Sequence, residues 1–114
     1  LFFLIFGGVN GAPSETIKTA VFNDSGQAFV QKTASIFGPE MMDMQSLGVD
    51  FSPDKMCELD GYKITNNYTQ TNGGETIYVY DYEAQLRGKG YKGDPMLFTG
   101  TVSLVKRGNS WYSL

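Results

Sequence analysis

Apolar and polar side chains alternate at every second residue through most of the chain after Gly61, and this alternation limits the possible folds more than any other feature. The first alternating stretch is "YKITNNYT", and residues 75–87, 96–107 and 111–114 follow it, separated by "TNGGE", "GKGYKGDP" and "GNS". A period of two is typical of a β-strand with one wet face. Because short turns join antiparallel neighbours, the sequence predicts a meander of four antiparallel strands.

The chain before Gly61 has helical spacing instead. A short helix is predicted to begin at Pro13 and Ser14 and to be interrupted by "NDSG". Asp24, with Gln27 three residues later, has the capping-box spacing of a second helix, which Gly38 and the proline after it end. The stretch up to Gly61 is predicted to be a connection with a single helical turn that begins after Ser52.

Length and order of elements predict a single α+β domain. With 114 residues there is little room for a second core. We therefore expect N-terminal helices packed on a curved antiparallel β-meander over residues 13–114. Residues 1–12, "LFFLIFGGVNGA", form a separate apolar segment that resembles the end of a signal peptide or a buried first strand. Its apolar run is far shorter than the roughly 20 residues of a membrane-spanning helix. The first alternative predicts a secreted or periplasmic protein.

Absent residue types exclude several kinds of chemistry. The chain has no histidine, which excludes histidine-based catalytic triads and zinc sites within it. Cys57 is the only cysteine, so no internal disulfide forms, and it is interpreted as a small apolar side chain. We predict no cofactor and no metal. The net charge is −3 without any basic run, so nucleic acid is not an expected partner. The basic residues of "RGKGYKG" are interpreted as a solvated hairpin tip rather than an anion site.

The ending "GTVSLVKRGNSWYSL" carries a resemblance to a known superfamily. An apolar alternation at Val102 and Leu104, then Lys106, Gly108 and Trp111, is similar to the end of many NTF2-like and SnoaL-like domains. The resemblance covers roughly residues 14–114 and implies a cone-shaped α+β domain with a pocket between helices and sheet. Cystatin-like architecture shares the broad plan, but the Gln-x-Val-x-Gly loop and the Pro-Trp hairpin of cystatin-type protease inhibitors do not occur.

The tyrosines of "ETIYVYDYEAQLR" are the main candidate site residues. Tyr78, Tyr80 and Tyr82 share one strand face. In a conical pocket they would bind a ligand together with Phe29 and Phe98. The alternative is packing against the helices with each hydroxyl bonded to one partner, which is commoner for buried tyrosines.

Three classes of function follow. The favoured one is a non-catalytic, exported binding module that holds a small apolar ligand or docks a protein through its sheet. An isomerase-like or cyclase-like enzyme would need a carboxylate beside a tyrosine. Asp60 is better explained as a turn former, and Asp81 points away from the tyrosine face. The third is a structural or assembly role, with a possible homodimer formed through "LFFLIF".

Two further features bear on these alternatives. Met41, Met42 and Met44 either fill gaps in packing or line the mouth of a cavity. Asn23 and Asn67 each begin an Asn-x-Ser/Thr sequence, which is compatible with export and glycosylation.

Overall fold

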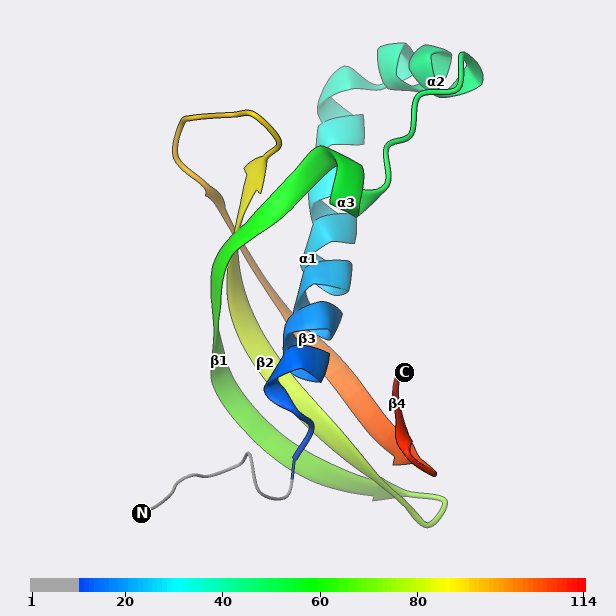
Figure 1. The fold of residues 1–114 in the computed structure, drawn as a ribbon, viewed down its shortest axis with the longest axis vertical. Coiled ribbons are helices and arrows are strands. Elements are labelled where there is room, and N and C mark those ends of the chain that lie inside the picture. Colours follow the sequence, from blue (N-terminus) through cyan, green and yellow to red (C-terminus); the bar gives the residue numbers. More distant parts are fainter. Residues whose placement is uncertain (1–10) are drawn as a thin grey trace.

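The computed structural model describes residues 11–114 and has the α+β architecture that the sequence predicts (Figure 1). The helices are α1 (Ser14–Phe37), α2 (Pro39–Ser46) and α3 (Pro53–Met56), and the strands are β1 (Cys57–Asn72), β2 (Glu75–Gly88), β3 (Met96–Arg107) and β4 (Ser110–Ser113). The strands form one antiparallel sheet in the order β1-β2-β3-β4. The predicted meander is therefore confirmed, and the sheet curves past α1, which lies against one of its faces.

The helical part differs from the prediction. α1 is continuous through "NDSG", so the predicted interruption and the cap at Asp24 are wrong. The buried positions Ala20, Val21 and Phe29 belong to one helix, and packing of this face against the sheet outweighs the local turn preference of "NDSG". Ser25 is also buried, and its hydroxyl donates a hydrogen bond to the Val21 carbonyl at 2.6 Å instead of competing with the helix.

The predicted helix end at Gly38 is confirmed, because Gly38 takes a positive φ of 47° that favours glycine. The segment that follows forms the unpredicted helix α2, whose first residue is Pro39. The predicted single turn is α3. It packs on α1, where a Cβ at Gly26 would lie 2.7 Å from Pro53 Cβ. Glycine therefore permits this close approach.

The core lies between α1 and the middle of the sheet. Its completely buried side chains include Val21 from the helix, Leu86 from β2 and Leu104 from β3. On the opposite face of the sheet, Ile77 and Val79 are also buried, which shows that this face is covered in part. β1 is an edge strand and carries two register shifts, between Leu59 and Gly61 and between Ile64 and Asn66. Such bulges are common at sheet edges, where they disturb pairing with another chain.

Candidate functional site

The three tyrosines of β2 point into the core, on the side of the sheet that faces α1. Tyr80 and Tyr82 are 6% and 2% exposed, and both hydroxyls have partners. The Tyr80 hydroxyl accepts a hydrogen bond from the Ala12 N–H at 3.0 Å, and the Tyr82 hydroxyl donates one to Asp24 Oδ2 at 2.5 Å. These bonds join the chain before α1, and α1 itself, to the sheet.

The remaining candidate residues lie in the same layer. The Tyr78 and Trp111 rings meet edge to face, with centroids 5.4 Å apart and planes at 68°. Phe29 of α1 and Phe98 of β3 have centroids 6.1 Å apart. The structure thus brings the five predicted residues together as parts of one packed layer between helix and sheet. Whether a ligand reaches them stays a prediction.

Tyr82 and Asp24 form a tyrosine–carboxylate pair that sequence analysis did not find. Burial, and then the hydrogen bond to Asp24, raise the pKa of Tyr82, so its hydroxyl stays protonated and donates. Gly100 faces Tyr82 in β3. A Cβ there would lie 2.6 Å from the Tyr82 hydroxyl and 2.9 Å from Asp24 Oδ2, so the pair occupies space that only glycine leaves open.

The two acids weighed in the sequence have other partners. Asp60 is the extra residue of the first β1 register shift and accepts two hydrogen bonds from Arg87, at 2.6 and 2.9 Å. Asp81 accepts one from the Thr101 hydroxyl at 2.7 Å, across the strand pair. Each carboxylate therefore has a nearby partner that explains its position without catalysis. The predicted orientation of Asp81, away from the tyrosine face, agrees with this contact.

Other single features have structural explanations. Cys57 is buried, and this burial raises the pKa of its thiol, which disfavours the reactive thiolate. The Asn23 sequence lies inside α1 with its Ser25 buried, whereas Asn67 and Thr69 are exposed on edge strand β1.

Within residues 11–114, no group of three or more His, Cys, Asp or Glu side chains is placed to hold a metal ion. None of the described helices is long and apolar enough to cross a membrane.

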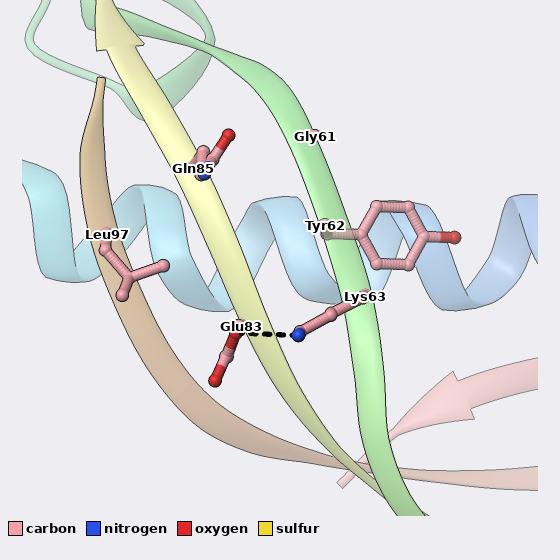
Figure 2. Close-up of a pocket in the computed structure, with 6 residues that line it drawn as sticks. All are labelled: Gly61, Tyr62, Lys63, Glu83, Gln85 and Leu97. Atoms are coloured by element: carbon pink, nitrogen blue, oxygen red, sulfur yellow. Dashed lines mark ion pairs between the residues drawn. The ribbon is translucent and has the colours of Figure 1, made fainter. Parts of the chain in front are cut away.

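A first hollow lies on the sheet face that points away from α1 (Figure 2). It has a volume of about 290 Å³ and is lined by residues of β1, β2 and β3, among them Tyr62, Lys63, Glu83, Gln85 and Leu97. Lys63 Nζ and Glu83 Oε1 are 3.5 Å apart across its floor, which neutralises both charges. The charged side chains of this open hollow are therefore already paired with each other.

A larger hollow separates the beginning of α1 from the β3–β4 hairpin, and we call it the hairpin groove. Its volume is about 530 Å³. α1 packs on β3 but not closely on β4, so β4 stands away from the helix. Polar and apolar surface line the groove in similar amounts. The polar side chains include Glu15, Thr16, Thr19, Asn23, Asn109 and Ser110, and the apolar ones are Ala20, Leu104 and Trp111.

Within residues 11–114, most of the exposed large apolar side chains lie at the far end of α1 and on the segment after it. We call this group the α2 surface. It consists of Ile36, Phe37, Met42, Met44, Leu47 and Val49. α2 contacts the end of α1 and projects beyond the sheet (Figure 1). Of the three methionines, Met41 is buried and fills a gap in packing, whereas Met42 and Met44 are exposed. This surface was not predicted from the sequence, although the methionine cluster was the available signal.

Comparisons of the chain with protein-family models, with curated proteins and with solved structures found no match.

Proposed function

We propose that this chain is a non-catalytic binding module and that its partner is a protein that docks on the α2 surface. The observation that carries the proposal is the exposure of Met42 and Leu47, at 71% and 83%, within residues 36–49, which carry six exposed apolar side chains. A contiguous exposed apolar patch marks an interaction site in a soluble protein. Exposed methionines suit such a site because their flexible side chains adapt to the partner.

Charge indicates what kind of protein fits. Residues 38–50 contain the acids Glu40, Asp43 and Asp50 and no Lys or Arg. We therefore propose a partner with an apolar hollow bordered by basic side chains. A second copy of the chain is a poorer partner, because a two-fold dimer through this surface would bring the same acids together. A homodimer is accordingly an outcome of the test and not part of the proposal.

A protein partner is favoured over a small apolar ligand because the Tyr80 and Tyr82 hydroxyls already have intramolecular partners. It is favoured over an enzymatic role because Asp60 and Asp81 are each explained by a structural contact. Asp24, the carboxylate beside a tyrosine, likewise accepts a structural hydrogen bond from the Tyr82 hydroxyl. The export of the protein remains part of the proposal on the strength of the sequence alone, from the apolar run and the small residues after it.

Site-specific photocrosslinking in the producing cells tests the proposal. A photoreactive residue replaces Met42 in one protein and Leu97, an exposed apolar residue of the sheet, in the control. We expect a discrete cross-linked protein at position 42 and not at position 97. With that protein purified, Leu47→Asp should weaken binding at least tenfold, because a charge enters an apolar contact, and added salt should weaken it further. Leu47 is exposed, so the variant should keep the parent's circular dichroism spectrum.

Two results would contradict this function. The first is equal cross-linking at positions 42 and 97, which would mean that the α2 surface is not preferred. The second is a cross-link of position 42 to another copy of the chain alone, confirmed by a dimer mass in light scattering. That second result would favour the assembly alternative.

A further inference from the structure

The hairpin groove carries a second inference, independent of the α2 surface. Thr16, Thr19 and Asn23 lie three and four residues apart, so they form one stripe along α1. The stripe faces the turn residues Asn109 and Ser110 across the groove. Most of these side chains are exposed, and the gap of about 530 Å³ between the stripe and the turn is open to solvent.

The hydrogen-bonding capacity of these side chains is not used inside the described part of the molecule. No side-chain hydrogen bond between residues 11–114 involves Thr16, Thr19, Asn23, Asn109 or Ser110. Hydroxyls both donate and accept, and each amide offers two donors and an acceptor on one rigid plane. The groove therefore presents both donors and acceptors, from α1 and from the turn.

The charge of the lining narrows the class of ligand. Glu15 is its charged residue, and no Lys or Arg lines the groove among the described residues. Phosphates, sulfates and carboxylates are normally held by cations, so this lining disfavours anionic ligands. A hydrocarbon ligand is disfavoured because it would cover the hydroxyls and amides without bonding them.

Trp111 adds one apolar surface to these polar side chains. The ring is half-buried and lies edge to face with Tyr78 at a centroid distance of 5.4 Å, so its orientation is fixed before any ligand binds. The buried side chains of Leu104 and Ala20 lie beneath it, at the base of the groove. A ligand that matches the site needs an apolar face for this part and many hydroxyl groups for the rest.

We propose that the hairpin groove binds a neutral saccharide. A sugar ring has a C–H face that suits the indole and hydroxyl groups around its rim that suit the amides of Asn23 and Asn109 and the hydroxyls of Thr16 and Thr19. The groove's volume falls within the roughly 300–1,000 Å³ of small-molecule sites. Because it is open along one side, it accommodates one or two sugar units of a longer chain.

The test is a titration of the full chain with named sugars. Cellobiose, mannobiose and N,N′-diacetylchitobiose serve as neutral probes, and glucose 6-phosphate is the anionic comparison. Trp111 is the only tryptophan, so its fluorescence reports on the groove directly. We expect a saturable change in Trp111 fluorescence with at least one neutral disaccharide. The dissociation constant should lie below about 10 mM. Binding in the millimolar range is expected because an open groove leaves part of the ligand hydrated.

A pair of double variants locates the binding. Asn23→Ala with Asn109→Ala removes one amide from each wall and should weaken binding at least tenfold. Gln70→Ala with Asn72→Ala, at exposed positions near the end of β1, is the matched control and should bind as the parent does. Circular dichroism confirms that both proteins are folded. Saturation-transfer NMR repeats the measurement without relying on fluorescence.

Each remaining outcome overturns the proposal. No saturable binding of any of the three disaccharides at 50 mM would exclude them as ligands and with them the class that they represent. Tighter binding of glucose 6-phosphate than of the neutral sugars would mean an anion site. Undiminished binding in the Asn23→Ala/Asn109→Ala protein would place the sugar elsewhere. None of these results bears on the α2 surface, whose test uses a different readout.

Discussion

At the scale of single residues, the contact between Tyr82 and Asp24 explains why a glycine interrupts the alternation of β3. Gly100 is the cross-strand partner of Tyr82, and the space beside it holds the Tyr82 ring and the Asp24 carboxylate. The sequence predicted that Tyr82 faces inward, since this follows from strand parity. It did not reveal the pairing with Asp24, because the two residues lie 58 positions apart and meet only when α1 docks.

Replacement of Gly100 by alanine tests this explanation. The new Cβ would lie 2.6 Å from the Tyr82 hydroxyl, so we expect the free energy of unfolding to fall by about 1–3 kcal/mol in urea denaturation. Gly61→Ala is the control, because no atom lies within 4 Å of its added Cβ and its effect should stay near 0.5 kcal/mol. Equal effects of the two substitutions would show that the ring does not occupy this space.

The raised pKa of Tyr82 predicts a loss of stability in alkali. The folded protein keeps the phenolic proton at a pH where the unfolded chain, with an ordinary pKa of 10.0, releases it. This contribution to stability is complete below pH 10 and is lost as the pH rises beyond it, at up to about 1.4 kcal/mol per pH unit.

Urea denaturation from pH 7 to 11 measures this loss. Tyr82→Phe should be less stable than the parent at pH 7, because it lacks the bond to Asp24, but its stability should fall less steeply above pH 10. Parallel pH profiles would show that Tyr82 does not retain its proton in the folded protein.

At the scale of elements, the sequence predicted strands better than helices. A period of two persists through residues 75–87 whatever the surroundings, and the turns between strands carry glycines such as Gly73 and Gly108 that take positive φ. The boundaries of the helices, in contrast, depend on tertiary contacts that the sequence does not show. "NDSG" has the composition of a turn, but the burial of Val21 and Phe29 on one face keeps α1 continuous.

α2 was missed for a related reason. It is short, follows a helix-ending glycine, and leaves most of its apolar side chains exposed, so no apolar stripe marks it. The same exposure is the basis of the α2 surface. A docking site of this kind is hard to predict from sequence, because apolar residues are normally taken as core.

The contact between α1 and α3 gives a prediction at this scale. In an open helix, Gly→Ala stabilises by about 1 kcal/mol. Gly26→Ala should instead destabilise by about 1–3 kcal/mol, because the new Cβ meets Pro53 Cβ at 2.7 Å. In a Pro53→Gly background, that contact is gone and the same substitution should become stabilising. The unfolding free energies of the parent, the two single variants and the double variant measure this reversal. Identical effects of Gly26→Ala in both backgrounds would contradict the close packing of α3.

At the scale of the whole molecule, the protein is more extended than a compact chain of its length. Its Cα radius of gyration is 16.5 Å, with principal extents of 49 × 32 × 20 Å, whereas about 13 Å is typical for this size. The long curved strands and the projecting α2 account for the difference (Figure 1). Its stability is therefore expected to be concentrated in the middle, where α1 crosses β2 and β3.

Hydrogen exchange tests this distribution. Amides in the centre of β2, between two paired strands, should exchange at least about a hundredfold more slowly than those of α2, which makes few contacts with α1 and is mostly exposed. The measurement is made at several protein concentrations. Protection of α2 equal to that of β2 at high dilution would mean that another part of the chain covers the α2 surface.

The order of the elements along the chain also has a consequence during synthesis. Each strand pairs with its neighbour in sequence, so the sheet can assemble as the strands leave the ribosome. α1 is made first, but part of its apolar face packs on β3, which is made much later. At about 5–20 residues per second, synthesis of the roughly 80 residues between Val21 and Val102 takes about 4–16 seconds. During that interval the apolar face of the helix is only partly covered, by α3, β1 and β2 as each is made, and a chaperone has time to bind the rest.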